Sequence, residues 1–372
     1  MAKSKHKKAK LSFFKTLVLI VTICLGIVLF LSSYAGMFDP RKFVLFAFIG
    51  LAYPFILFAN VIVLVFWLLN KNWKVSLLIV AFVFSGYPTL FSTIKFWGEE
   101  GADLKTTDHL RIMTYNVHNF KKFGDKNDLE TKRNFLSVLK EQNPDIILFQ
   151  EFYTRFKGEY NLVDSIKVQL KTPYTYFKSS KENDYEAMGL AIFSKYPLKN
   201  KDFIPFDAYG ANGCLLADVI INNKKIRIFN LHLKSISFGN EDYQYLDQVK
   251  EINPDKQSSK RIYRALRSAF KKRAENIDLL KKEIAKCNTP YILAGDFNDT
   301  PASFAVKQLT NNLNNAFFEK GIGMGVTYNG KFPNFQIDYI ATTKDLQIVN
   351  YKVTKAKLSD HYPVRSDIEI LP

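Results

Sequence analysis

The stretch NTPYILAGDFNDTP, residues 288–301, decides how this chain folds. Its apolar run, residues 291–294, is typical of a short buried strand, which the following Gly and Pro bring to an end. Asp296 and Asn298 therefore stand at the end of the predicted strand, where side chains two residues apart on an extended backbone point the same way. Such a pair can hold a metal ion or an attacking water. Gly-Asp is also ordinary turn chemistry, so the rest of the chain decides between these interpretations.

Upstream of this stretch, two more predicted strands end in polar side chains. Residues 111–115 form the first, which is followed by Asn116, and residues 145–151 form the second, which ends at Glu151. Between them, residues 127–142 space their apolar side chains along one face of a helix that stops at an Asn-Pro pair. Glu151 therefore stands at the end of a buried strand, as Asp296 does.

The same pattern continues toward the C-terminus. Residues 215–221 and 225–233 form a predicted hairpin around Asn222-Asn223, and His232 lies near its end. Asp338 falls inside a predicted strand, and Asp360 and His361 precede the last one. The complete set of polar residues in such places is Asn116, Glu151, His232, Asp296, Asn298, Asp338, Asp360 and His361.

This set of side chains predicts a particular chemistry. Carboxylates and amides without cysteine suit Mg²⁺ or Mn²⁺ rather than zinc. Two histidines without a Ser or Cys nucleophile beside a base indicate direct attack by water on phosphorus, one imidazole taking a proton and the other giving one. The residues by themselves therefore predict a phosphoester hydrolase.

The order of the motifs resembles the endonuclease/exonuclease/phosphatase superfamily over residues 108–372. The motifs are Met-Thr-Tyr-Asn116-Val-His, Leu-Phe-Gln-Glu151, Asn-Leu-His232-Leu, Gly-Asp296-Phe-Asn298, Ile-Asp338-Tyr-Ile and Ser-Asp360-His361-Tyr-Pro-Val. The resemblance implies a four-layer α-β-β-α sandwich with the site at one end of two packed sheets. We therefore expect an α/β catalytic domain over residues 105–372, preceded by transmembrane helices in residues 1–104.

The resemblance also implies roles for the residues. Glu151 would bind the divalent metal, with Asn116 and Asp360 as ligands or close partners. Asp296 would orient or deprotonate the attacking water. The remaining roles are a hydrogen bond from Asn298 to the scissile phosphate, a general base in His361 oriented by Asp338, and a general acid in His232.

The first hundred residues are typical of a membrane region. Residues 17–31, 43–69 and 75–97 are largely apolar, and each run reaches the roughly 20 residues that cross a bilayer. A cleaved signal peptide is the alternative for the first run, but the following runs would still need a membrane. We therefore expect three spans, which makes the protein a multi-pass membrane protein.

Lysines predict the orientation of the spans. Lys3, Lys5, Lys7, Lys8 and Lys10 precede the first span. Lys71 and Lys74 lie between the second and third, whereas Glu99, Glu100 and Asp103 follow the third. An excess of lysine marks the cytoplasmic side, so an odd number of spans places the catalytic domain on the non-cytoplasmic face.

Charge bears on the substrate. The chain carries a net charge of +17, and residues 105–372 have 41 Lys and Arg against 31 Asp and Glu. A predicted helix over residues 258–287 is strongly basic, and its face either meets phosphates or is simply solvated. The three cysteines show no zinc spacing, although a Cys214–Cys287 bridge stays open.

These observations predict a membrane-anchored, nuclease-like phosphodiesterase that depends on Mg²⁺ or Mn²⁺. Nucleic acid is favoured over a lipid head group as its partner because of the basic charge, and no protein partner is predicted. A phospholipid, sphingomyelin or inositol phosphate phosphoesterase is the alternative, favoured by the spans. A non-catalytic, membrane-tethered binding domain is the third hypothesis.

Overall fold

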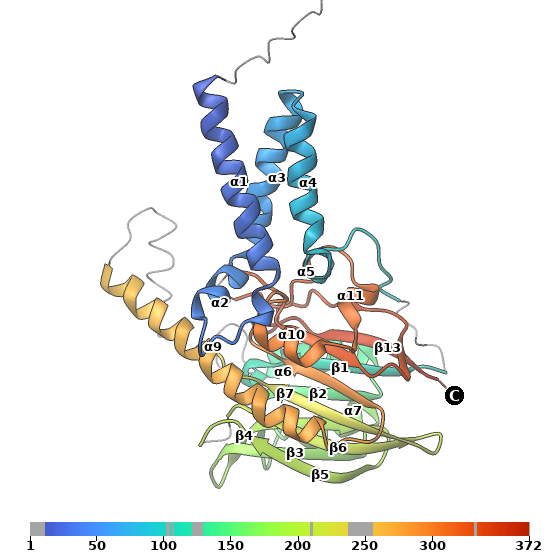
Figure 1. The fold of residues 1–372 in the computed structure, drawn as a ribbon. Helices are drawn as coiled ribbons and strands as arrows, with labels where there is room; N and C mark the ends of the chain where they lie inside the picture. Colours follow the sequence, from blue (N-terminus) through green and yellow to red (C-terminus); the bar gives the residue numbers. More distant parts are fainter. Residues whose placement is uncertain are drawn as a thin grey trace, which may run out of the picture.

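The computed structural model describes residues 12–101, 105, 108–120, 129–208, 211–236, 256–330 and 333–371, and the structural statements below concern these residues. They form an N-terminal helical region and, from Leu110 onward, an α/β domain (Figure 1). The lysines at positions 3–10, Asp103 and most of the polar segment at 237–255 lie outside the described residues.

Two β-sheets form the centre of the α/β domain. The first has the strand order β11-β13-β1-β2-β4-β3, with β12 beside β13, and the second has the order β5-β6-β7-β8-β10-β9. Both sheets are mixed, because β1 and β2 pair in parallel, as do β7 and β8. The strands are β1 (Leu110–Asn116), β2 (Ile146–Arg155), β3 (Tyr174–Glu182), β4 (Glu186–Ser194), β5 (Leu198–Pro205), β6 (Gly213–Ile221), β7 (Lys224–His232), β8 (Tyr291–Asp296), β9 (Asn314–Asn315), β10 (Asp338–Thr342), β11 (Leu346–Ile348), β12 (Lys352–Val353) and β13 (Val364–Ile370).

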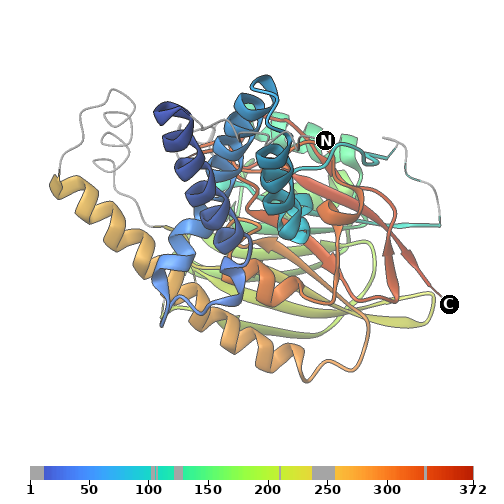
Figure 2. The ribbon, with the colours of Figure 1, turned by 45° about the horizontal axis from the view of Figure 1, so that its top comes forward.

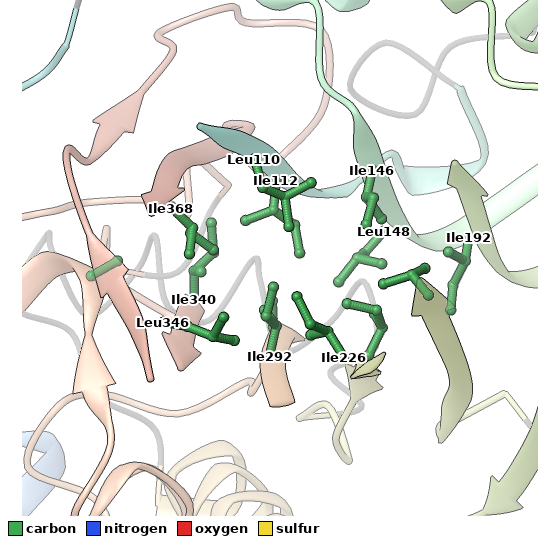
Figure 3. Close-up of a cluster of buried hydrophobic side chains, with 14 of the residues drawn as sticks. Leu110, Ile112, Ile146, Leu148, Ile192, Ile226, Ile292, Ile340, Leu346 and Ile368 are labelled. Carbon is green, nitrogen blue, oxygen red and sulfur yellow. The ribbon is translucent and has the colours of Figure 1, made fainter. Parts of the chain in front are cut away.

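The two sheets pack face to face through aliphatic side chains. Ile112 and Leu148 from the first sheet meet Ile292 and Ile340 from the second, and all four are fully buried (Figure 3). Alternate residues of a strand point to opposite faces, so the other face of each sheet is free to take helices. The inner core is therefore a dry layer that holds the strands of both sheets in fixed register.

Helices cover the two outer faces. On the first sheet, α6 (Leu129–Gln142) and α7 (Leu162–Leu170) bury apolar side chains that include Phe135 and Ile166. On the second, α9 (Lys256–Ile284) and α10 (Phe304–Thr310) do the same, and the short α11 (Ala316–Lys320) packs beside β10. The four-layer α-β-β-α sandwich is confirmed.

The N-terminal region is a bundle of three helices that stands on the α/β domain. Its rods are α1 (Phe13–Ser33), α3 (Tyr53–Leu69) and α4 (Trp73–Ser85) (Figure 1). The turn η1 (Ala35–Met37) and the helices α2 (Val44–Leu51) and α5 (Tyr87–Thr93) lie at the base of the bundle, against the domain. One helix, α1, is by itself long and apolar enough to cross a membrane.

The second and third apolar runs are broken rather than straight. The chain bends by 59° between α2 and α3 and by 77° between α4 and α5, so three spans result only if each bent pair counts as one. Pro54 and Pro88 stand in the first turn of the helix after each break. Proline fits a first helical turn but cannot donate the hydrogen bond that would continue the preceding helix.

Candidate active site

A pocket of about 210 Å³ lies at one end of the sandwich and collects the predicted residues. Its lining includes six of the eight, namely Asn116, Glu151, Asp296, Asn298, Asp360 and His361. The other two, His232 and Asp338, are buried directly behind the lining and contact it. All eight predicted site residues are therefore neighbours, although they come from both sheets.

Asp296 is the last residue of β8, and the chain turns sharply around it. Gly295 has a φ of 144°, and a Cβ atom there would come within 2.1 Å of the Leu231 carbonyl oxygen, so only glycine fits. Asn298 reaches Asp296 by a turn rather than along an extended strand: its backbone N–H donates to Asp296 Oδ1 at 2.8 Å and its Nδ2 to Oδ2 at 3.1 Å. The two side chains meet as the sequence predicts, but through turn geometry.

Glu151 does not end a strand, because β2 continues to Arg155. The register of β2 against β4 shifts between Phe149 and Phe152, and Glu151 sits in this bulge with a φ of 50°. A bulge re-aims a side chain that regular pairing would direct elsewhere. Asn116, at the end of β1, donates from Nδ2 to Glu151 Oε1 at 3.3 Å and to Asp296 Oδ2 at 3.0 Å.

Asp338 and His361 form a buried pair beside Asp296. Asp338 begins β10 instead of lying inside a strand, and it stands opposite Asp296 in the antiparallel register. His361 Nδ1 lies 3.0 Å from Asp338 Oδ2, which leaves Nε2 facing Asp296 Oδ2 at 3.8 Å. The backbone N–H of His361 donates to the Ser359 hydroxyl at 3.2 Å, which fixes the loop that carries the ring.

His232, the last residue of β7, enters the site from the other side. Its Nδ1 lies 3.0 Å from the Ala211 carbonyl oxygen, so Nδ1 is the protonated nitrogen of this contact. Its Nε2 is 3.7 Å from Asp296 Oδ2 and 3.8 Å from Glu151 Oε1, and has no hydrogen-bond partner among the described atoms. This ring nitrogen is therefore a buried polar atom without a partner directly behind the pocket lining, which calls for an explanation beyond packing.

The charges of the site push its pKa values apart. Burial raises the pKa of Asp296 to about 6, and repulsion from Asp338 acts in the same direction. Burial alone would raise the pKa of Glu151, but the contact with His118 and the neighbouring imidazoles lower it to about 2. Burial alone would lower the pKa of His361, whereas Asp338 and Asp296 raise it well above the usual value. Such separated pKa values are typical of catalytic groups.

The oxygen atoms of the site fit a divalent cation. Glu151 Oε2 and Asp360 Oδ1 lie 3.5 Å and 3.7 Å from His118 Nδ1, so both carboxylates flank this ring in the pocket. A second grouping, Asp296, Asp338 and His361, brings its ligand atoms within 4.8 Å of one another. Since Asp338 already orients His361, Glu151 and Asp360, with Asn116 nearby, are the residues that could hold an ion such as Mg²⁺ or Mn²⁺, which prefer oxygen ligands.

The structure also places residues in the pocket to which the sequence assigned no role. His118 follows Asn116 by two residues and contacts both Glu151 and Asp360; its pKa is raised, mainly by the contact with Glu151. The Tyr328 ring packs against that of His361, with 5.4 Å between the ring centres. The His in Asn116-Val-His118 was the available sequence signal, whereas Tyr328 lies in a loop without a recognisable pattern.

The basic helix needs one correction. Arg273 does not belong to a solvated face: it is 1% exposed, it lines the pocket, and its Nε donates to Asp299 Oδ2 at 2.9 Å. Its Nη1 donates to the Lys234 carbonyl oxygen at 3.0 Å. The Cys214–Cys287 bridge left open by the sequence is absent, because both thiols are free.

Comparisons with known proteins agree with this geometry. A model described as the Endonuclease/Exonuclease/phosphatase family matches residues 113–361. A second model, described as a domain of unknown function, matches residues 15–93. Comparison with curated proteins finds no match.

Solved structures with a similar fold include three bacterial proteins of this description. An endonuclease/exonuclease/phosphatase from Beutenbergia cavernae is 15% identical, with a TM-score of 0.49 over 71% of this chain and 72% of its own. A family protein from Leptotrichia buccalis is 18% identical, with a TM-score of 0.49 over 70% and 99%. One from Bacteroides vulgatus is 17% identical, with a TM-score of 0.48 over 72% and 100%.

Proposed function

The chain belongs to the endonuclease/exonuclease/phosphatase family, whose members hydrolyse phosphoester bonds, and from this premise we propose that it is a membrane-anchored phosphodiesterase that uses a divalent cation. The observation that carries the proposal is the meeting of Glu151, Asp296 and His361 in one pocket, with His232 buried directly behind its lining. These groups supply a metal ligand, a residue that orients water, and two imidazoles for proton transfer. A phosphoester bond broken by water needs these components and no covalent intermediate.

The residues of the chain divide the reaction as follows. The oxygen of a water held by Asp296 forms a bond to phosphorus, and the phosphorus–oxygen bond to the leaving alcohol breaks. His361 Nε2, when unprotonated, takes a proton from the water, while Asp338 holds the ring through Nδ1. His232, when both ring nitrogens carry a proton, gives the one on Nε2 to the leaving oxygen and keeps the one on Nδ1 that bonds the Ala211 carbonyl. In the structure Asn298 donates from Nδ2 to Leu233 O and to Asp296, so its hydrogen bond to the phosphate stays a prediction.

Mg²⁺ or Mn²⁺ held by Glu151 and Asp360, with Asn116 beside them, would neutralise the charge on the phosphate oxygens. Glu151 suits this role because its lowered pKa of about 2 keeps it ionised at neutral pH. Its side chain remains 30% exposed, through the pocket, and is therefore accessible to an ion. The carboxylates themselves would repel a phosphate, so a cation is what makes the pocket attractive to one.

The side chains of the helical bundle support the membrane anchor. Large apolar residues point outward, among them Ile20, Phe58 and Leu77, which are 55%, 66% and 70% exposed. Polar groups point inward: Trp67 Nε1 donates to Thr22 Oγ1 at 2.9 Å. A soluble bundle would show the opposite arrangement, since water rewards burial of the large apolar groups.

We further propose that α1 and the bent pairs α2–α3 and α4–α5 make three spans, with the catalytic domain on the non-cytoplasmic face. The start of α1 and the turn between α3 and α4 lie at the same end of the bundle, away from the domain (Figure 1). That end carries Lys71, in the turn, and Lys74, in the first turn of α4, and positive ends stay in the cytoplasm. The domain at the opposite end would then face away from the cytoplasm.

Nucleic acid, the substrate favoured by the sequence, is a second candidate, for which the exposed Arg264 and Arg267 of α9 are the support. Non-specific binding of nucleic acid rests on such cations. No protein partner is proposed. Hydrolysis of a phosphodiester bond is common to nucleic acid and lipid substrates, so this reaction can be tested first.

The test is hydrolysis of bis(p-nitrophenyl) phosphate by the purified full chain in detergent, with Mg²⁺, Mn²⁺ or EDTA. We expect metal-dependent release of nitrophenol, which Asp296→Asn and His361→Ala reduce by roughly a thousandfold, because each removes a group that handles the water. Asp184→Asn, at an exposed turn, is the matched control and should be fully active. An active Asp296→Asn protein would contradict the mechanism, and full activity in EDTA would remove the metal from it. A wild-type protein without activity on any diester would favour the non-catalytic binding domain.

A further inference from the structure

The wall of the catalytic pocket contains a residue of the membrane region. Leu51, the last residue of α2, lines the pocket together with Pro333, Phe335 and Ile337 from the catalytic domain. The catalytic carboxylates Glu151 and Asp296 line the same pocket. One part of the pocket is therefore apolar and adjoins the anchor, while another part carries the charges.

The next helix, α3, adds apolar side chains beside the apolar side of the pocket. Phe55, in the first turn of α3, packs edge-on against Phe335, with 6.1 Å between the ring centres. Phe55 is still 58% exposed, and Phe58, one turn further along α3, is 66% exposed. Exposed aromatic rings of α3 therefore lie next to the apolar side of the pocket.

The base of the helical bundle packs closely against the segment around Ala302, near the pocket. A Cβ atom at Gly50 would come within 3.3 Å of the Ala302 carbonyl oxygen and 2.8 Å of the Ala35 Cβ. Ala302 is buried against Leu29 and Tyr53, and it follows Thr300, which lines the pocket. Close packing of this kind fixes the pocket at the base of the bundle.

The basic helix α9 packs beside α2. The α9 residues Tyr263 and Phe270 pack against Phe48 of α2, with 5.0 Å and 5.2 Å between ring centres, and α2 lies between the bundle and α9 in both views (Figures 1 and 2). The segment from Lys256 to Arg273 contains no acidic residue. Cations at a membrane surface attract anionic lipid head groups.

We propose that the substrate is a membrane phospholipid, whose phosphodiester enters the pocket while its acyl chains remain along α2 and α3. This inference rests on the proposed phosphodiesterase function and names its substrate class. Water adds to phosphorus, one of its two ester bonds breaks, and the leaving oxygen receives a proton, so that a water-soluble head-group product leaves the bilayer. A nucleic acid has no chain to place on the apolar wall, whereas a phospholipid uses both the wall and the charged part of the pocket.

The experiment uses the full chain in vesicles of phosphatidylcholine and phosphatidylglycerol with labelled head groups, and measures label in the aqueous phase. The same preparation is assayed with bis(p-nitrophenyl) phosphate and with single-stranded DNA and RNA. Leu51→Gln and Phe55→Ala each should lower the ratio of lipid to soluble-diester turnover by about tenfold, because each removes apolar contact with the lipid. Leu77→Ala, 70% exposed on α4 and away from the pocket and from α3, should leave the ratio unchanged.

The outcomes separate the two proposals. Release of head groups that Asp296→Asn abolishes, with the lower ratio in either wall variant, supports the phospholipid. Hydrolysis of the soluble diester without release of head groups overturns the inference and leaves the phosphodiesterase intact, and preferred cleavage of DNA or RNA overturns it in favour of nucleic acid. Absence of activity on every diester overturns the proposed function itself.

Discussion

At the scale of single residues, the site depends on side chains that the backbone holds in unusual conformations. Glu151 and Asn298 both have positive φ values, of 50° and 54°, and Gly295 has a φ that other residues rarely adopt. Such conformations cost free energy and persist where surrounding structure over-determines them. Here they turn a carboxylate, an amide and a strand end toward the same pocket.

The pair of Asp338 and His361 leads to a prediction about pH. The two neighbouring carboxylates raise the pKa of His361, so the ring is protonated at neutral pH. It loses this proton, and can act as a base, only as the pH rises. We expect activity to increase with pH. In Asp338→Asn, loss of one charge lowers the pKa of His361, and the rising limb of the profile should move to lower pH by about 1–3 units.

The measurement is the pH profile of kcat/KM on the soluble diester for the wild type and Asp338→Asn. The variant should also be slower, because the ring loses the partner that orients it. Asp184→Asn again serves as the control. A rising limb at the same pH in both proteins would mean that His361 is not the group whose titration limits the rate.

At the scale of elements, α9 acts as a brace behind the site rather than as a charged surface alone. Arg273 crosses from α9 to Asp299, one residue after Asn298, and to the Lys234 carbonyl oxygen, two residues after His232. The pair is buried, with side chains 1% and 6% exposed. The helix therefore holds two of the loops that carry catalytic residues.

Breaking this brace should destabilise the protein. Arg273→Met leaves the Asp299 carboxylate buried without its partner, which costs about 3–5 kcal/mol and should lower Tm by roughly 10 °C. The measurement is thermal unfolding of the full chain in detergent. Lys272→Met, at the adjacent exposed position, should unfold like the wild type.

A double variant, Arg273→Met/Asp299→Leu, completes the test of the brace. It removes both charges, and it should recover part of the lost Tm because no uncompensated charge remains. Equal Tm values for Arg273→Met and the wild type would show that the brace contributes nothing measurable.

At the scale of the whole molecule, several contacts join the helical bundle to the catalytic domain. The backbone of Lys95 pairs with Gly323 in both directions at 2.8 Å, and the Glu99 N–H donates to Lys320 O at 2.8 Å. Arg41 forms an ion pair with Asp278 of α9. With the packing around Gly50, these contacts hold the pocket at the base of the helical bundle.

The three-span proposal predicts from which side of the membrane each part of the protein can be labelled. In a variant without the native cysteines, Lys71→Cys should react with a membrane-impermeant thiol reagent only after the cell is opened. Lys199→Cys, on an exposed part of the catalytic domain, should react in intact cells. Labelling of both positions from the same side would contradict an odd number of spans.

Much of this protein is determined by local sequence. The alternation and length of apolar runs place most strands and helices, and Asn222-Asn223, with φ values of 50° and 62°, makes the predicted hairpin turn. Local pattern also selects the residues of the site, because polar side chains beside buried strands are conspicuous. The family and the four-layer fold follow from the order of those motifs.

Only the tertiary structure decided how these residues meet. The bulge at Glu151, the turn from Asp296 to Asn298, and the position of Asp338 opposite Asp296 depend on pairing between strands far apart in sequence. Burial of Arg273 and the presence of Leu51 in the pocket wall depend on which elements pack together. Local sequence sets which face of an element is apolar, but not which partner covers it, because packing free energy is realised only between surfaces that the complete fold brings into contact.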